Sequence, residues 1–197
     1  MAKRALDVLL TVLLLPIAVP LTALMAAALA WELRGNPFFV QKRIGKDGRP
    51  FRMYKLRTMR DPRPGELRPI VVDDWDTFVF SPPGRCDPRV TRLGAFARKT
   101  SIDELPQLLN VLRGEMSLVG PRPELPEIVA QYPPAFHERH RVLPGIAGLA
   151  QVSGRSDLTY SETIAYDLCY IDTWSIWRDL RILARTLLVV ARGAGAR

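Results

Sequence analysis

Two adjacent carboxylates, Asp103 and Glu104, lie in the stretch Ser-Ile-Asp-Glu-Leu-Pro-Gln (101–107) of a strongly basic chain. An ionised aspartate is a usable nucleophile. A neighbouring glutamate can hold Mg²⁺, which offsets the repulsion between a carboxylate and an anionic phosphate. The residues from Ser101 to Glu104 also match a capping box, in which the serine caps a helix and the glutamate reaches back to it. The pair therefore has two interpretations, catalysis at a phosphate or capping of a helix.

The position of Pro106 bears on this choice. In a helix capped by Ser101, Pro106 would be the fifth helical residue, where its ring and its missing N–H group are unfavourable. A helix that begins at Pro106 is more favourable, because proline suits the first helical turn. Asp103 and Glu104 would then lie just before a helix N-terminus, where the helix dipole stabilises negative charge. We therefore expect both carboxylates to be ionised.

Basic residues occur on both sides of the two acids. Arg98 and Lys99 precede them, and Arg122 follows in a Gly-Pro-Arg-Pro turn that should hold its guanidinium group in a fixed direction. Arg155 lies further on, in a glycine-rich stretch. Guanidinium groups bind phosphate oxygens in bidentate fashion. Arginines around two acids, in a chain that also carries an apolar segment, indicate a phosphorylated substrate handled at a bilayer.

The apolar segment is free of charged residues from 8 to 31 and is long enough to cross a bilayer as one helix. Pro16 and Pro20 lie in its middle and favour a kink or a break. Basic residues flank both ends, whereas a spanning helix normally has them on one side. We therefore expect a re-entrant helix-break-helix, with a straight span and a cleaved signal peptide as the alternatives.

The rest of the chain shows weaker patterns. Lys46-Asp47-Gly48 between two β-type runs predicts a hairpin over 38–59, whose face is basic. The stretch 174–192 alternates apolar residues and arginines at helical spacing and predicts an amphipathic helix, either interfacial or packed on the core. Short helices are expected at 92–99, 106–112 and 136–140, loop at 143–155, and an irregular insertion or lid at 61–89.

The charge balance favours anionic partners. The 197 residues contain 28 Lys and Arg against 20 Asp and Glu, a net charge of +8. No glycine-rich P-loop is visible, and no basic motif interleaved with aromatic residues indicates nucleic acid. His137 and His140 lack an acidic partner at metal-ligand spacing, which favours structural roles. The rival to an enzyme is a non-catalytic membrane-surface protein that binds anionic lipid or nucleic acid through its basic face.

Several long motifs occur together in one order. They are Lys-Arg-Ala-Leu-Asp (3–7) before the apolar run, Phe-Arg-Met-Tyr-Lys-Leu-Arg-Thr-Met (51–59), Arg-Lys-Thr-Ser-Ile-Asp-Glu-Leu-Pro-Gln (98–107), Gly-Pro-Arg-Pro (120–123), and Pro-Gly-Ile-Ala-Gly-Leu-Ala-Gln-Val-Ser-Gly-Arg (144–155). In these motifs the chain closely resembles the bacterial sugar transferase family, the small monotopic phosphoglycosyl transferases. It departs from the family at Val19, where a serine usually precedes the proline, and at Ala147, where threonine is usual.

The resemblance implies an α+β monotopic membrane protein at the cytoplasmic face of the bacterial inner membrane. Residues 1–35 would form a re-entrant membrane helix hairpin, which the resemblance favours over the other two readings. Residues 36–197 would form a cytoplasmic catalytic domain with a small β-hairpin and interfacial amphipathic helices.

The resemblance also implies a reaction, the transfer of a sugar 1-phosphate from a UDP-sugar to undecaprenyl phosphate with release of UMP. This would be the first membrane step of bacterial glycoconjugate synthesis, such as that of exopolysaccharide. Asp103 would be the nucleophile of a covalent phosphosugar-aspartyl intermediate, and Glu104 would hold the cofactor Mg²⁺. The residues expected to contact substrate phosphates are Lys55, Arg98, Arg122 and Arg155. The expected partners are both substrates, inner-membrane lipid and a second copy in a homodimer, but no nucleic acid.

Overall fold

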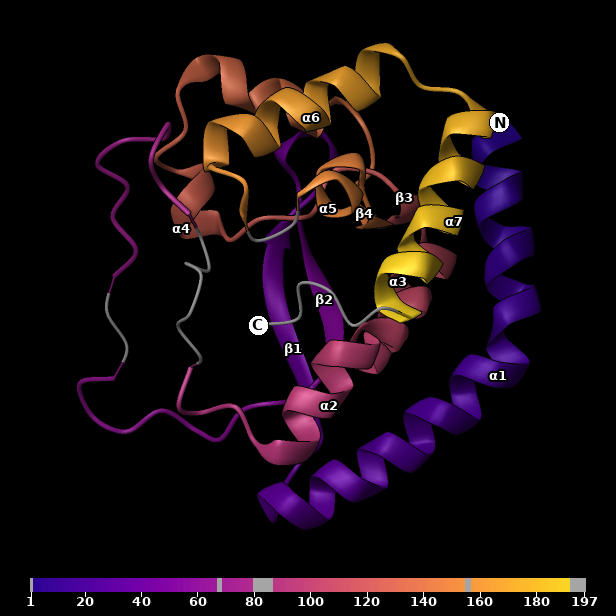
Figure 1. Cartoon of the computed structure of the whole chain (residues 1–197), viewed down its shortest axis with the longest axis vertical. Helices are drawn as coiled ribbons and strands as arrows, with labels where there is room; N and C mark the ends of the chain where they lie inside the picture. Colours follow the sequence, from indigo (N-terminus) through magenta and orange to yellow (C-terminus); the bar gives the residue numbers. More distant parts are fainter. Residues whose placement is uncertain (1, 67–68, 80–86, 155–156, 192–197) are drawn as a thin grey trace.

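The computed structural model describes residues 2–66, 69–79, 87–154 and 157–191, and it combines helices with two small sheets, as the α+β expectation requires (Figure 1). The elements are α1 (Ala2–Leu33), β1 (Phe38–Ile44), the 3-10 helix η1 (Lys46–Gly48), β2 (Pro50–Leu56), α2 (Arg92–Thr100), the 3-10 helix η2 (Ile102–Gln107), α3 (Leu108–Arg113), β3 (Ser117–Val119), α4 (Pro126–Val129), the 3-10 helix η3 (Pro134–Arg141), β4 (Gly145–Ala147), α5 (Leu149–Ser153), α6 (Tyr160–Asp172) and α7 (Ile176–Ala191).

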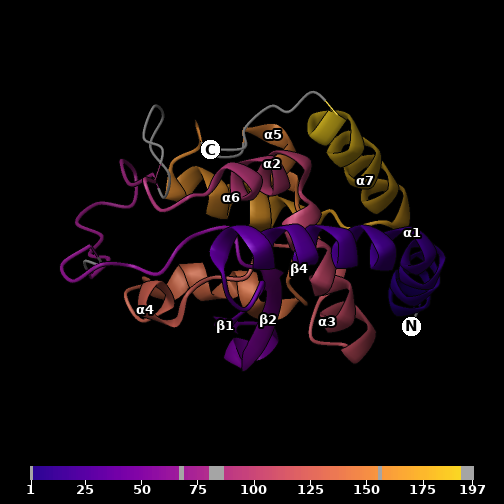
Figure 2. The ribbon, with the colours of Figure 1, turned by 90° about the horizontal axis from the view of Figure 1, so that it is seen from below.

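Helix α1 is long, apolar and bent. It is one continuous helix that contains Pro16 and Pro20, and it turns sharply near its middle (Figures 1 and 2). The expected break is thus a bend inside a continuous helix, because a proline removes one helical hydrogen bond without ending the helix. Its most apolar window has a mean hydropathy of 2.5 and is only 17% buried, so by length and composition α1 could cross a membrane.

The first turns of α1 are fastened to the rest of the molecule by polar contacts. The buried carboxylate of Asp7 accepts hydrogen bonds from Ser117 Oγ at 3.0 Å and from the Leu118 N–H group at 3.1 Å. The Lys3 ammonium group donates to Asp179 Oδ2 at 2.7 Å. The basic and acidic residues at the start of the chain therefore anchor α1 to β3 and α7. This anchoring places the bent helix beside the site described below.

The expected hairpin is confirmed. Strands β1 and β2 pair antiparallel from Phe38 opposite Leu56 to Ile44 opposite Pro50. In the connection, Asp47 has φ 55° and Gly48 has φ 72°. Aspartate tolerates this left-handed conformation and glycine adopts it without strain, which is why Asp-Gly signals a hairpin.

The expectation of a loop over 143–155 is wrong. Strand β4 pairs parallel with β3, with Ser117 opposite Gly145 and Val119 opposite Ala147, and helix α5 follows. A Cβ atom on Gly145 would lie 2.1 Å from the Gly120 nitrogen, so glycine permits this close approach of two backbones. Gly145, one of the glycines that suggested a loop, instead allows β4 to lie close to the backbone at Gly120.

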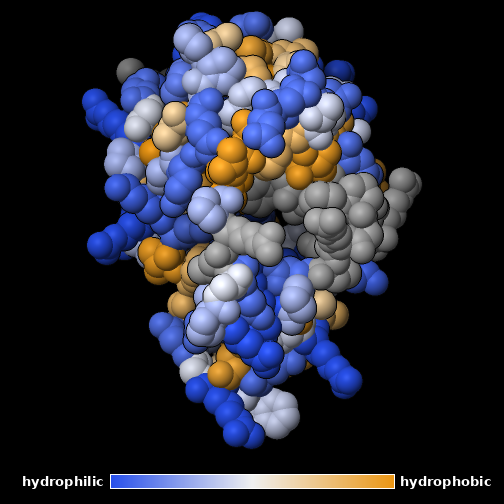
Figure 3. Space-filling model, turned by 90° about the vertical axis from the view of Figure 1, so that its left-hand side faces the viewer, coloured by the Kyte–Doolittle hydropathy of each residue, from blue (hydrophilic) through white to orange (hydrophobic). Residues whose placement is uncertain are grey.

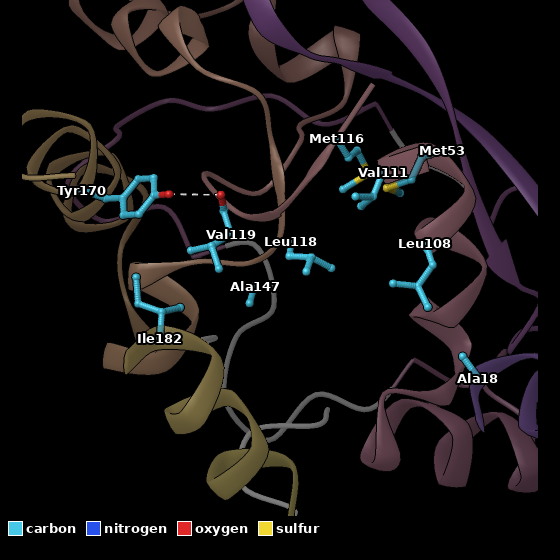
Figure 4. Close-up of a cluster of buried hydrophobic side chains, with 10 residues drawn as sticks. All are labelled: Ala18, Met53, Leu108, Val111, Met116, Leu118, Val119, Ala147, Tyr170 and Ile182. Atoms are coloured by element: carbon cyan, nitrogen blue, oxygen red, sulfur yellow. Dashed lines mark hydrogen bonds between the residues drawn. The ribbon is translucent and has the colours of Figure 1, made fainter. Parts of the chain in front are cut away.

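Three clusters of buried side chains hold the described elements together, and the third joins Ala26 and Leu29 of α1 to Leu56 of β2. One contains Met53, Leu108, Val111, Met116 and Leu118, and reaches Ala18 of α1 and Ile182 of α7 (Figure 4). Within it, the Tyr170 hydroxyl donates a hydrogen bond to the Val119 carbonyl at 3.1 Å. The cluster therefore joins both apolar helices to the centre of the fold.

The second cluster anchors the insertion 61–89, whose described parts contain no helix or strand, as expected. Trp75 from this insertion lies with its ring centroid 5.6 Å from that of Tyr132 and 5.0 Å from that of Tyr160.

Three of the expected helices are confirmed. Those at 92–99, 136–140 and 174–192 are α2, the 3-10 helix η3 and α7. Helix α6 was not anticipated, although Thr159 and Glu162 form a capping box at its start.

Candidate active site

The two acids lie in the first turn of η2. Ser101, with φ 57° and ψ 17°, ends α2 and leads directly into η2, and its side chain makes no capping hydrogen bond. The capping-box interpretation is therefore wrong. The helix expected over 106–112 is α3, but it starts at Leu108 and not at Pro106, which lies inside η2. The left-handed residue turns the chain, so the carboxylates of Asp103 and Glu104 enter the interior instead of capping a helix.

Two cations from distant parts of the chain bind Glu104. Lys55 Nζ, from β2, lies 3.0 Å from Glu104 Oε1, and Arg122 Nη2, from the turn after β3, lies 2.7 Å from the same oxygen. Among the described residues, both hydrogen bonds that Glu104 accepts end on Oε1. The second oxygen, Oε2, thus keeps its lone pairs for another ligand.

The two carboxylates have opposite pKa shifts. Burial opposes ionisation of Glu104, but the charges of Arg122 and Lys55 outweigh it and lower the pKa of Glu104. For Asp103, burial and then the negative charge of Glu104 raise the pKa to about 6, against the opposing effect of Lys55, Arg122 and Arg98. Glu104 is therefore ionised at any ordinary pH, whereas Asp103 is ionised only above a pKa of about 6, because it loses more hydration than the cations compensate.

The Asp103 carboxylate is buried but accepts no hydrogen bond from the described residues. The residue is 7% exposed. A carboxylate with free lone pairs, in a site rich in positive charge, is a suitable nucleophile toward a phosphorus atom.

Arg98 and Arg155 are the other two residues that were predicted to contact substrate phosphates. Arg98 Nε donates to Thr58 Oγ1 at 2.9 Å, and its charge acts on Asp103, so α2 contributes a third cation near the acids. Arg155 lies outside the described residues. The structure thus brings Lys55 and Arg122 into direct contact with Glu104 and places Arg98 close enough to affect Asp103.

The described residues contain no group of three or more His, Cys, Asp and Glu side chains able to hold a metal ion. Mg²⁺, however, is commonly bound by one or two carboxylates together with substrate phosphates. Glu104 Oε2 beside Asp103 is an oxygen-only donor set of this kind, so the residues fit an ion shared with a phosphorylated substrate.

An apolar cavity of about 250 Å³ adjoins Glu104. Its walls come from α1, η2, α3, β3, the β4–α5 segment and α7, and Glu104 is a charged residue in its lining. Side chains that line it include Ile17, Leu21, Leu108, Leu118, Val152 and Leu183. A long hydrocarbon chain could therefore lie against α1 and α7 while its polar end reaches the carboxylates.

The sequence analysis missed a buried ion pair behind Arg122. Arg139 Nη2 lies 2.6 Å from Asp167 Oδ2, and both side chains are almost fully buried. The two residues are too far apart in the chain for a spacing motif. Asp167 does fall on the buried stripe of α6, between Ile164 and Tyr170. A charge on such a stripe is the signal that could have found the pair.

Comparison with known proteins identifies the family. The profile described as "Bacterial sugar transferase" matches residues 1–193. The exopolysaccharide production protein ExoY of Rhizobium meliloti is 40% identical over 201 residues, which cover 100% of this chain and 88% of the relative. The UDP-glucose:undecaprenyl-phosphate glucose-1-phosphate transferase of Caulobacter vibrioides is 45% identical over 193 residues, covering 94% and 68%. The undecaprenyl-phosphate galactose phosphotransferase of Salmonella typhimurium is 36% identical over 200 residues, covering 98% and 41%. The chain therefore belongs to the bacterial sugar transferase family, and it is an enzyme.

Proposed function

We propose that this enzyme transfers a sugar 1-phosphate from a UDP-sugar to undecaprenyl phosphate and releases UMP. The observation that carries the proposal is the pair of Asp103 and Glu104 among Lys55, Arg98 and Arg122, with Glu104 in the lining of an apolar cavity. The cations suit the phosphates of both substrates, and the apolar walls suit a polyprenyl chain. The printed names of the Caulobacter and Salmonella relatives specify the same acceptor.

The reaction proceeds in two displacements at one phosphorus atom. A carboxylate oxygen of Asp103 attacks the β-phosphorus of the donor, and the bond from that phosphorus to the bridging oxygen breaks, so UMP leaves. The sugar phosphate is then joined to Asp103 as an acyl phosphate. In the second step, a phosphate oxygen of the lipid attacks the same phosphorus, and the Asp103 carboxylate departs. Lys55 and Arg122 balance negative charge in both steps.

Glu104 positions charge and does not attack. Its Oε1 atom fixes Lys55 and Arg122, while Oε2, with oxygens of the substrate phosphates, would hold Mg²⁺. A bound Mg²⁺ supplies Lewis acidity at the phosphoryl oxygens and offsets the repulsion between Asp103 and the donor.

The apolar helices define the face that meets the membrane. Large apolar side chains of α1 are exposed, as are Phe96 of α2 and Trp177, Leu187 and Leu188 of α7. The opposite side of the molecule, away from α1 and α7, is mainly hydrophilic (Figure 3). This asymmetry supports a monotopic arrangement in which the bent α1 is re-entrant and α7 lies at the interface. The cytoplasmic face of the inner membrane, which the family resemblance implies, is part of the same proposal.

The experiment that tests this function is UMP release by the detergent-purified protein from a panel of UDP-sugars, with undecaprenyl phosphate and Mg²⁺. We expect sustained release with one sugar, dependent on the lipid and abolished by chelation of Mg²⁺. Release that needs neither lipid nor metal, or lipid binding without any release by a folded protein, would contradict the proposal.

The pH dependence follows from the raised pKa of Asp103. The attacking form is the carboxylate, which is present above a pKa of about 6 and is lost as the pH falls through it. We therefore expect kcat/KM, which reports ionisations of the free enzyme and substrate, to decline tenfold per pH unit below about pH 6. Initial rates from pH 4.5 to 8 at fixed ionic strength measure this decline of kcat/KM on the acidic side. A kcat/KM that stays level down to pH 4.5 would show that burial does not raise the pKa of Asp103 to about 6.

A further inference from the structure

The turn that carries Arg122 is held by an unusually complete set of hydrogen bonds. Four successive carbonyl oxygens each accept one bond from another part of the fold. The bonds are Gly145 N to Pro121 O at 2.8 Å, Arg139 Nη2 to Arg122 O at 2.9 Å, Arg43 Nη1 to Pro123 O at 3.1 Å, and Ile44 N to Glu124 O at 2.9 Å. The backbone on either side of the Arg122 side chain is therefore fixed by β1, β4 and η3.

Arg139 is the charged, buried member of this set. It is 2% exposed, and its guanidinium group also binds Asp167 Oδ2 at 2.6 Å and the Tyr132 and Tyr160 hydroxyls at 2.7 and 3.2 Å. Removing two charges from water opposes the gain from pairing them, so a buried ion pair is weak as a source of stability. The pair instead fixes the orientation of the Arg139 guanidinium group, whose five N–H donors lie in one rigid plane and can hold several acceptors at once.

We propose that Arg139 is a positioning residue that acts through the Arg122 carbonyl to hold the Arg122 guanidinium group against Glu104. Asp167 and the two tyrosine hydroxyls orient Arg139 from the other side. The chain of contacts runs from Asp167 through Arg139 to the Arg122 backbone, and from the Arg122 side chain to Glu104 Oε1 at 2.7 Å. Arg139 itself touches neither carboxylate of the acid pair.

The variant that tests this role is Arg139→Lys. A lysine keeps a positive charge beside Asp167, but its single ammonium group cannot span Asp167, the tyrosines and the Arg122 carbonyl together. A misplacement of about 1 Å at a catalytic group lowers the rate by about 100-fold, and we expect a loss of kcat of this size. The matched control is Arg141→Lys, the same substitution on the same 3-10 helix at an exposed side chain, which pairs with the exposed Glu138. This control should leave kcat unchanged.

A double-mutant cycle separates positioning from general destabilisation. Residues that act as a unit are not additive, whereas independent effects multiply. In an Arg122→Gln background, Arg139→Lys should therefore cause little further loss of kcat. Losses that multiply across the cycle would overturn the proposal. If Arg139→Lys does not fold, Asp167→Asn takes its place in the cycle with the same expected pattern.

The tests by kcat rest on the proposed function. A second measurement, of the mobility of the Arg122 side chain, does not depend on turnover. The Arg122 Nε–Hε group in ¹⁵N-arginine-labelled protein, assigned by its loss in Arg122→Gln, reports side-chain order through its heteronuclear NOE. We expect an ordered Arg122 in the wild type and the Arg141→Lys control, and a mobile one in folded Arg139→Lys. An equally ordered Arg122 in Arg139→Lys would refute the positioning role, whether or not the wild type releases UMP.

Discussion

Replacing Asp103 with asparagine is expected to abolish turnover, lowering kcat by about 10⁴-fold or more, because a neutral amide cannot attack phosphorus as the carboxylate does. The fold should survive, since no described residue donates a hydrogen bond to this carboxylate. Burial also disfavours its charge, as the raised pKa of Asp103 indicates. The melting temperature of Asp103→Asn in detergent should therefore equal or exceed that of the wild type. UMP release and thermal unfolding, measured on the same preparation, test both parts.

The matched control for this variant is Asp47→Asn. Asp47 is an exposed residue of the hairpin turn with φ 55°, a conformation that asparagine also tolerates. It should retain wild-type kcat. Substantial turnover by folded Asp103→Asn would remove Asp103 as the nucleophile.

Replacing Glu104 with glutamine is expected to lower kcat by about 10³-fold, the upper range for loss of one preorganised electrostatic group. The amide oxygen can still accept hydrogen bonds, but the negative charge that pairs with Lys55 and Arg122 is gone. The buried Lys55, whose pKa burial already lowers, would lose its principal counter-charge. The variant should also need a higher Mg²⁺ concentration for half-maximal rate, because Oε2 is no longer a charged ligand.

A titration of rate against Mg²⁺ measures this second effect. Glu138→Gln, at an exposed side chain of η3, is the control and should follow the wild-type curve. If Glu104→Gln turned over at the wild-type rate at low Mg²⁺, the metal role assigned to Glu104 would be incorrect.

Local signals in the sequence predicted the elements that depend on local chemistry. The Asp47-Gly48 turn predicted the β1–β2 hairpin, and the spacing of apolar residues and arginines predicted α7. Pro16 and Pro20 predicted a bend, and α1 bends near its middle without ending there (Figure 1). These features are set by residues within a few positions of each other, so a single sequence contains enough information for them.

Features that depend on distant partners were not predictable in this way. Strands β3 and β4 have three residues each, too few for a periodic pattern, and Ser117 pairs with Gly145, a residue far outside its local sequence. The raised pKa of Asp103 arises from burial, which only the folded arrangement of α1, η2 and β2 establishes. Arg139 acquires its role from its contact with the Arg122 carbonyl, and no motif records that contact.

The most direct test of the account is the mass of the enzyme after exposure to its UDP-sugar and Mg²⁺ without the lipid acceptor. We expect a gain equal to one sugar phosphate, located on the peptide that contains Asp103. This gain should disappear when undecaprenyl phosphate is added and should be absent from Asp103→Asn. An enzyme that turns over with both substrates, yet shows no adduct and releases no UMP from the sugar donor alone, would contradict the covalent mechanism and indicate direct transfer to the lipid.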